Sequence, residues 1–300
     1  MAKIKIVEVG PRDGLQNEKK FLSAEIRAEF VKKLVSAGLP SVEIGAFVNP
    51  EKIPQMVGST EVVQAINKAF PKSKVAFPVL VPNERGMMDA ISAGAKEVAI
   101  FAAASESFSK ANINCSIEES FERFVPVIKL ARKHKIKVRG YLSTCFYCPF
   151  DGKIKPQKVV PLAKRLIQMG CYEVSIGDTI GAANPKEVKI LIQLLKRVIP
   201  IKKIAMHFHD TRGTALANIL QSYQLGITTF DSSLGGLGGC PYAPGAQGNV
   251  STEDVVYMFE GMGVKTGVSL AKLLEVNQWM SEQMEKTLPS KVGKAGLPKA

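Results

Sequence analysis

The stretch Met169-Gly170-Cys171-Tyr172-Glu173-Val174-Ser175-Ile176 decides the fold of this chain. A helical pattern of apolar residues ends at Met169, and a glycine follows where a helix C-terminus favours positive φ. A strand pattern begins a few residues later. The same step from helix to glycine to strand occurs before the second, fourth, sixth and eighth predicted strands, at Ala37-Gly38, Ala93-Gly94, Met169-Gly170 and Leu225-Gly226. A repeated unit of this kind indicates a closed, repetitive architecture.

Strand and helix patterns alternate along the whole chain. The predicted strands cover residues 3–9, 41–46, 74–81, 96–102, 136–144, 172–177, 203–209 and 228–233. The predicted helices cover residues 23–37, 60–69, 84–93, 117–134, 157–169, 185–198, 213–225 and 251–262. Eight strands that are each followed by a helix predict an α/β fold, the (β/α)8 TIM barrel. A doubly wound open sheet is disfavoured, because no G-x-G-x-x-G motif follows the first strand.

The domain boundaries follow from the same pattern. We expect residues 1–265 to form the barrel and residues 266–300 to add a C-terminal helix and a tail packed on it. The end of this tail is rich in lysine, glycine and proline, and we expect it to be mobile.

The composition is that of a soluble globular enzyme, with 46% hydrophobic and 22% charged residues. No apolar run approaches the ~20 residues of a membrane helix, so we expect no membrane association. The N-terminus runs directly into an alternating segment at residues 4–9 without a targeting signal, which favours a cytoplasmic location. The five cysteines lack framework spacing and suit reduced thiols. We interpret Cys145 and Cys148 as the end of a strand, because no second pair accompanies them.

The net charge of +13 favours an anionic partner. The lysines are scattered and no aromatic residues interleave with them, so nucleic-acid binding is disfavoured. An anionic small molecule and a merely solvated basic surface both remain open.

Two of the three histidines, His207 and His209, lie at the end of the predicted strand 203–209. Residues i and i+2 of a strand point to the same side, so the two imidazoles can bind one divalent metal ion. The alternative is a pair of hydrogen-bonded polar residues at a strand end. Asp13, after the first strand, can reach the same ion, because the first, seventh and eighth strands are neighbours in a closed barrel. The ions suited to this set are Mg²⁺ and Mn²⁺.

A glycine-rich segment at residues 235–249 follows the eighth strand and holds six glycines and one thiol, Cys240. We interpret it as a loop that closes over a site, since long loops in compact domains are usually functional. The alternative is a linker with an incidental cysteine. Asn249 ends the segment and offers an amide oxygen as a fourth metal ligand.

Other polar residues follow the predicted strands. In a TIM barrel the chemistry lies at the carboxyl ends of the strands, here called the barrel mouth. Glu43 and Asp178 face this mouth, each with a structural alternative. Lys110, Asn112 and Ser116 lie near a helix start that can meet a phosphate, although simple capping is the commoner role.

Five segments resemble the 3-hydroxy-3-methylglutaryl-CoA (HMG-CoA) lyase family: VEVGPRDGLQNE (7–18), NINCSIEES (112–120), GDTIG (177–181), HFHDTRGTALAN (207–218) and GGLGGCPYAPGAQGN (235–249). The resemblance implies a metal-dependent TIM barrel that cleaves HMG-CoA to acetyl-CoA and acetoacetate, as in leucine degradation. It also implies a homodimer. Arg212 departs from the family motif, which often has Tyr there, and no cysteine occurs near the C-terminus.

The residues that match the family's functional positions are as follows. The resemblance implies metal ligation by Asp13, His207, His209 and Asn249, substrate binding by Arg12 with Gln16 beside it, an active-site thiol at Cys240, and supporting acids at Glu43, Asp178 and Glu253.

These roles suit a retro-Claisen cleavage, for which two reaction classes compete. His207, or Asp13 through water, would take the hydroxyl proton, and Arg12 would stabilise the enolate. Cys240 would protonate the product carbon, with covalent catalysis by this thiol as the alternative. Condensing enzymes of the isopropylmalate or homocitrate synthase type share the Arg-Asp-Gly and His-x-His motifs. They tend to carry Glu-Arg-type residues where this chain has Cys240-Pro241-Tyr242. A basic nucleic-acid-binding protein is the remote alternative.

Overall fold

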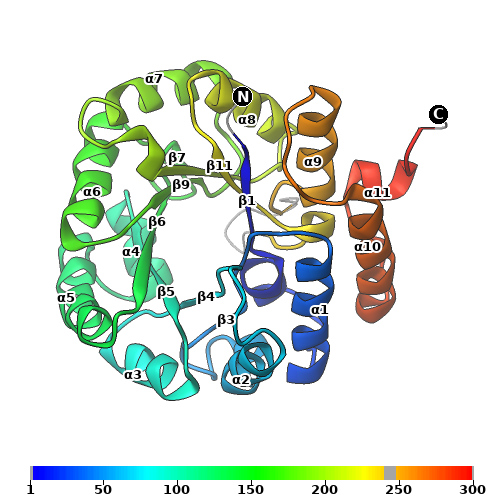
Figure 1. Cartoon of the computed structure of the whole chain (residues 1–300). Coiled ribbons are helices and arrows are strands. Elements are labelled where there is room, and N and C mark those ends of the chain that lie inside the picture. Colours follow the sequence, from blue (N-terminus) through cyan, green and yellow to red (C-terminus); the bar gives the residue numbers. More distant parts are fainter. Residues whose placement is uncertain (1–2, 240–247, 299–300) are drawn as a thin grey trace.

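A computed structural model describes residues 3–239 and 248–298 of the chain. Its centre is a sheet of nine parallel strands in the order β2-β1-β11-β10-β9-β6-β5-β4-β3. The strands are β1 (Lys5–Glu8), β2 (Ser41–Val42), β3 (Gly45–Ala46), β4 (Pro78–Leu80), β5 (Glu97–Ala103), β6 (Lys137–Ser143), β9 (Val174–Asp178), β10 (Ile204–Phe208) and β11 (Thr229–Ser232). Figure 1 shows these strands inside a ring of helices.

The two ends of the sheet meet within one predicted strand, residues 41–46. Glu43 N donates a hydrogen bond to Glu8 O on one side (2.8 Å). Ile44 N donates to Pro78 O on the other side (3.0 Å). The predicted strand therefore pairs with β1 through its first half and with β4 through its second half, which closes the barrel. The prediction of a TIM barrel is confirmed.

The eight predicted helices are all present in the described part of the chain. They are α1 (Ala24–Ser36), α2 (Ser59–Ala69), α3 (Glu84–Ala93), α5 (Ile117–His134), α6 (Pro156–Met169), α7 (Pro185–Leu195), α8 (Ala215–Gln224) and α9 (Thr252–Gly261). The glycines that end four of the predicted helical patterns adopt positive φ: Gly38, Gly94, Gly170 and Gly226. None of the described helices combines the length and apolar character needed to cross a membrane.

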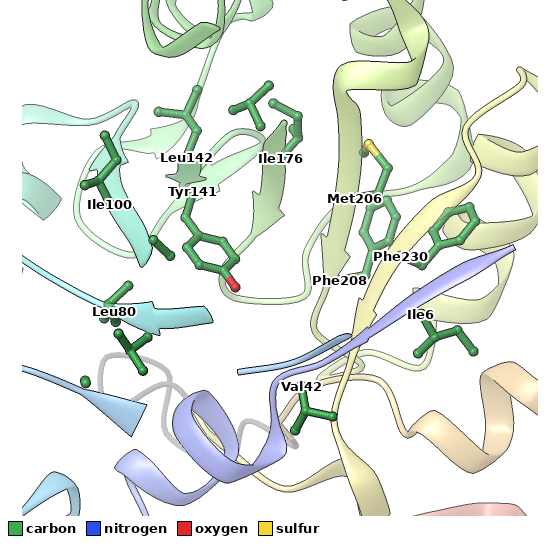
Figure 2. Packing of buried hydrophobic residues seen from close by; sticks show 14 of the residues in the cluster. Ile6, Val42, Leu80, Ile100, Tyr141, Leu142, Ile176, Met206, Phe208 and Phe230 are labelled. Atoms are coloured by element: carbon green, nitrogen blue, oxygen red, sulfur yellow. The ribbon is translucent and has the colours of Figure 1, made fainter. Parts of the chain in front are cut away.

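The hydrophobic core forms where alternate residues of neighbouring strands meet. Figure 2 shows side chains such as Leu80, Ile100, Leu142 and Ile176 around the sheet, all of them buried. Each such side chain contributes about 1.5–3 kcal/mol when fully buried. This packing fixes the register of the strands and hence the positions of the residues at the barrel mouth.

Besides three short 3-10 helices, η2 (Pro54–Met56), η3 (Ile201–Lys203) and η4 (Leu234–Gly236), further elements of the barrel were not predicted. They are the five-residue turn η1 (Gly10–Gly14), the helix α4 (Glu106–Ile113), and a hairpin of β7 (Tyr147–Cys148) with β8 (Gly152–Lys153). The prediction that this segment ends a strand holds for Cys148, the last residue of β7, whereas Cys145 lies two residues beyond the end of β6. Asp151 in the hairpin turn accepts a hydrogen bond from Ser105 Oγ (2.6 Å). Both thiols are free and buried.

The C-terminal region consists of α10 (Leu270–Met284) and α11 (Lys291–Ala295), outside the barrel next to α1 and α9 (Figure 1). The tail expected to be mobile is docked at its start, because Asp254 accepts hydrogen bonds from Ser290 Oγ (3.0 Å) and Val292 N (2.8 Å). The division of the chain at residue 265 stays a prediction.

Candidate active site

The turn η1 brings Arg12 and Asp13 to the barrel mouth directly after β1. Gly14 N donates to Val9 O (3.1 Å), which closes a π-helical turn. Turns of this type occur frequently at functional sites. Arg12 is 6% exposed, and its Nε donates to Glu43 Oε2 (2.8 Å). Glu43 lies at the break between β2 and β3, so the closing strand of the barrel holds this arginine.

The two carboxylate oxygens of Asp13 have different partners. Oδ1 accepts from Arg12 Nη1 (2.7 Å), whereas Oδ2 accepts from Asn249 Nδ2 (2.9 Å). Oδ2 also lies 4.0 Å from His207 Nε2. Burial raises the pKa of Asp13, but the charge of Arg12 and the two histidines outweigh it and lower the pKa to about 2. Asp13 is therefore ionised at neutral pH.

The histidines lie on β10 and just beyond it, with ring centroids 5.3 Å apart. His207 Nδ1 lies 3.3 Å from Asp231 Oδ2. Burial lowers the pKa of His207, but the hydrogen bond and charge of Asp231 outweigh it and raise the pKa. Burial and the neighbouring His207 lower the pKa of His209 to about 4. His209 is thus neutral at physiological pH, the form in which imidazole binds metals.

Asn249 is held beside His209 by the backbone. The two residues form an antiparallel β-bridge, flanked by the hydrogen bonds Asp210 N to Gly248 O (3.0 Å) and Val250 N to Phe208 O (3.0 Å). Asn249 Oδ1 and His209 Nδ1 are buried and have no hydrogen-bond partner in the described part of the chain. Unpartnered buried polar atoms are rare and suggest a missing ligand.

These residues fit a divalent cation. One donor atom each from Asp13, His207 and His209 lies within 4.8 Å of the others, and the unpartnered amide oxygen of Asn249 is adjacent to this group. One carboxylate, two imidazoles and one amide oxygen form a mixed oxygen and nitrogen donor set suited to Mg²⁺, Mn²⁺ or a related ion.

Comparisons with known proteins place the chain in a family. The family model described as HMGL-like matches residues 3–280. The chain belongs to the HMGL-like family. It is 51% identical over 294 residues to the cytoplasmic 3-hydroxy-3-methylglutaryl-CoA lyase of Rattus norvegicus, covering 98% of this chain and 85% of that protein. It is 51% identical over 293 residues to the mitochondrial hydroxymethylglutaryl-CoA lyase of Pongo abelii, covering 98% and 89%.

Solved structures of HMGL-like proteins agree with the fold. The hydroxymethylglutaryl-CoA lyase of Pseudomonas aeruginosa superposes with a TM-score of 0.94 at 48% identity, covering 98% of this chain and 97% of that chain. An HMG-CoA lyase from Acinetobacter baumannii in complex with coenzyme A and 3-methylmalate superposes with a TM-score of 0.93 at 33% identity, covering 99% and 98%.

The other acids predicted for this HMGL-like site hold its loops in place. Asp178, at the end of β9, accepts from Ala182 N and Ala183 N (3.0 Å each). Burial raises the pKa of Asp178 to about 6 against these hydrogen bonds. Glu253 accepts from Gly235 N (2.9 and 3.0 Å) and from Asn277 Nδ2 of α10 (2.6 Å). It thereby ties the first residues of the glycine-rich segment to the C-terminal helix.

The remaining predicted residues lie apart from the cluster or outside the described residues. Gln16 Oε1 accepts from Arg12 Nη1 at 3.4 Å. Ser116 caps α5 by accepting from Glu119 N (3.1 Å) in a complete capping box, and Asn112 is exposed on α4. Within residues 3–239 and 248–298, no hydrogen bond or ion pair joins either residue to the metal-ligand candidates. Cys240 lies outside the described residues.

The sequence analysis did not identify three residues inside this HMGL-like barrel: Arg139, Tyr141 and Asp231. Arg139 Nη2 donates to Asp231 Oδ1 across the interior (2.7 Å). The Tyr141 ring lies 5.0 Å from the Arg139 guanidinium and 5.6 Å from that of Arg12. Its hydroxyl points into the barrel (Figure 2) and has no partner among the described residues. The signal was a charged or hydroxylated residue inside an otherwise apolar strand, at alternate positions 139 and 141.

Proposed function

We propose that this chain cleaves 3-hydroxy-3-methylglutaryl-CoA into acetyl-CoA and acetoacetate. The observation that carries the proposal is the convergence of Asp13, His207 and His209. The buried Arg12 lies beside them, on the same turn η1 as Asp13. The lyase names of relatives about 50% identical over nearly the whole chain support it.

A divalent cation would be held by Asp13, His207, His209 and Asn249. Their donor atoms fit it in type, and the unpartnered oxygen of Asn249 supports a fourth ligand. When bound, the ion supplies a Lewis acid for the tertiary hydroxyl and a carboxylate oxygen of the substrate. The native ion is Mg²⁺ or Mn²⁺ in this proposal.

The chain's own residues move the proton and stabilise the charge. Asp13 takes the proton of the tertiary hydroxyl through a water molecule; His207, the other candidate base, could take it only while its Nε2 is not bound to the ion. The bond between C2 and C3 of the acyl group then breaks, the alkoxide becomes the ketone of acetoacetate, and the electron pair passes to the thioester as an enolate. Arg12 is buried and fixed by Glu43 (2.8 Å), so it can stabilise the enolate oxygen without reorganisation. Such a stabiliser contributes about 10²–10³ in rate.

Protonation of the enolate carbon completes the reaction. In this proposal the Cys240 thiol donates that proton, with covalent catalysis as the alternative. Replacement by serine at this position should lower turnover strongly, and full activity in Cys240→Ser would contradict the role.

Substrate binding and cellular context form the rest of the proposal. The acyl-CoA substrate is anionic, in keeping with the net charge of +13. Gln16 would assist Arg12 in binding the substrate. Asn112 and Ser116 would meet the CoA phosphates, and Ser116 would do so in addition to capping α5. We expect a cytoplasmic location, because a cytoplasmic lyase occurs among the relatives. We also expect a homodimer and a role in leucine degradation, as the family resemblance implies.

The test is removal and readdition of metal with HMG-CoA as substrate and acetoacetate as readout. Activity should vanish after exhaustive chelation and return with Mg²⁺ or Mn²⁺. His209→Gln should abolish the return, whereas His134→Gln, on an exposed residue of α5, should not. Activity that survives complete removal of metal would refute the proposal. Acetyl-CoA with a 2-oxo acid serves as a parallel assay and should give no condensation product.

A further inference from the structure

Asp231 of β11 is a buried carboxylate that contacts His207 from the side away from Asp13. Its Oδ2 accepts from Ser175 Oγ (2.7 Å) and lies 3.3 Å from His207 Nδ1. Its Oδ1 accepts from Arg139 Nη2 (2.7 Å). Asp231 is 1% exposed, and these partners lie on β10 (His207), β9 (Ser175) and β6 (Arg139).

An ionised Asp231 determines which nitrogen of His207 carries the proton. A carboxylate only accepts hydrogen bonds, so Nδ1 must be the donor. In the neutral imidazole Nε2 is then unprotonated, and this atom faces Asp13 Oδ2 at 4.0 Å. The lone pair of His207 thus points toward the group that also contains His209 and Asn249.

The surroundings of Asp231 keep it ionised and fixed. Arg139 donates to both of its oxygens, from Nη2 to Oδ1 (2.7 Å) and from Nη1 to Oδ2 (3.2 Å), and such a bidentate guanidinium contact favours the carboxylate form. Arg139 is fully buried and is fixed on its other side by Glu173 Oε1, which accepts from Nε (2.8 Å). Glu173 in turn lies 3.6 Å from Lys5 Nζ. A row of alternating charges therefore crosses the barrel interior and ends at His207.

We propose that Asp231 is a positioning residue that holds His207 in the tautomer protonated at Nδ1, so that Nε2 is directed at the cation. The inference rests on the proposed function, because it needs a cation at the ligand group. A carboxylate that orients a metal-binding histidine typically changes metal affinity about 10–100-fold when it is altered.

The competing explanation is that Asp231 only neutralises Arg139. The variant Asp231→Asn separates the two. Arg139 donates to both oxygens of Asp231, with the shorter bond on Oδ1 (2.7 Å) and the longer one on Oδ2 (3.2 Å). The Ser175 hydroxyl on the Oδ2 side can rotate and accept instead of donating. The amide oxygen is therefore favoured on the Oδ1 side. The amide NH₂ then replaces Oδ2 and donates to His207 Nδ1. This forces the proton onto Nε2, where the cation needs a lone pair.

The matched control is Glu173→Gln. Glu173 is the other carboxylate on Arg139, and in the described part of the chain it forms no hydrogen bond or ion pair with His207. Both substitutions remove one buried charge next to Arg139. Only the change at residue 231 alters the group that touches the histidine, so a purely structural role predicts the same effect from both.

The experiment uses the full chain labelled with ¹⁵N-histidine. The chain has three histidines, and His134→Gln and His209→Gln assign their signals. Long-range ¹H–¹⁵N spectra of the metal-free protein at alkaline pH should show wild-type His207 protonated at Nδ1. Asp231→Asn should shift it to Nε2, and Glu173→Gln should leave it unchanged. Mn²⁺ affinity, measured from the electron paramagnetic resonance of free Mn²⁺, should fall about 10–100-fold in Asp231→Asn only.

The outcomes are distinguishable. Wild-type His207 protonated at Nε2 overturns the inference, and this measurement decides even if Asp231→Asn does not fold. An unchanged tautomer and affinity in Asp231→Asn, or an equal loss of affinity in both variants, also overturns it. Failure of the wild-type protein to bind Mn²⁺ while the tautomer follows Asp231 instead overturns the proposed cation site.

Discussion

The buried pair of Arg12 and Glu43 leads to a prediction in which stability and catalysis separate. Among the described residues, Arg12 is the only hydrogen-bond partner of the Glu43 carboxylate, which is 0% exposed, and Arg12→Met removes it. Breaking a buried ion pair from one side costs about 3–5 kcal/mol, because the other charge stays uncompensated. Since about 1 kcal/mol shifts Tm by roughly 2–4 °C in a chain of 150–250 residues, a loss near 10 °C is expected here.

The loss should depend on pH in a defined direction. Burial already raises the pKa of Glu43, and the charge of Arg12 opposes this rise. Without Arg12 the pKa rises further. A carboxyl whose pKa is raised by folding contributes stability at low pH that is lost as the pH increases. The difference in Tm between wild type and Arg12→Met should therefore be small near pH 5 and largest near pH 8.

The double variant Arg12→Met/Glu43→Gln provides the decisive comparison. It carries no buried charge at the pair, so most of the lost Tm should return. Turnover measured as acetoacetate release should stay about 10²–10³-fold low, because the group facing the enolate is still absent. Arg85→Met, an exposed arginine on α3, is the control for the substitution itself. A double variant that regains turnover, or an Arg12→Met protein with unchanged Tm at pH 8, would refute the reasoning.

Three further predictions concern single residues around the site. Burial raises the pKa of Glu8 to about 8, so this carboxyl destabilises the fold as the pH rises from the pKa of the unfolded chain through 8. The fall in Tm between pH 6 and 9 should therefore be smaller in Glu8→Gln than in wild type. Identical profiles of Tm against pH would contradict this prediction. Gly235→Ala places a Cβ 2.7 Å from Leu288 Cβ and 3.1 Å from Leu288 Cγ, at a φ of +65°. Urea unfolding should show a free energy of unfolding lower by about 1–3 kcal/mol. Leu288→Ala, which removes Cγ and the atoms beyond it, should recover part of this loss. Tyr141→Phe breaks no hydrogen bond among the residues that the structure describes. We expect stability within about 0.5 kcal/mol of wild type but a lower kcat/KM, and an unchanged kcat/KM would argue against contact with substrate.

The predictable part of the structure was the part governed by local periodicity. Apolar residues alternate between the strand period of 2 and the helix period of 3.6, and this alternation predicted the eight strands and eight helices. The spacing of His207 and His209 predicted that their rings lie close together. Asp13 was found because closure of the barrel makes the first strand a neighbour of the last.

The missed features depend on tertiary contacts. Arg139 and Asp231 lie on strands that are not adjacent in the sheet, so their ion pair follows from the size and stagger of the barrel and leaves no pattern in the sequence. Helix α4 is only eight residues long, and helices of this length depend on their surroundings for stability. The docking of the tail depends on Asp254, which lies 36 residues before Ser290. Nothing in the tail itself indicates this partner.

The ligand candidates come from the first strand of the barrel and from its last two strands, which lie side by side in the sheet. Asp13 follows β1, the histidines belong to β10, and β11 pairs with β1 through the register Lys5 to Thr229. A growing polypeptide therefore holds Asp13 long before its partners on β10, which follow about 190 residues later. In the proposed function, capture of the ion would occur last and would add RT ln(1 + [L]/Kd) to the finished fold alone. Incomplete chains would gain nothing from the metal, which makes its retention a mark of completed synthesis.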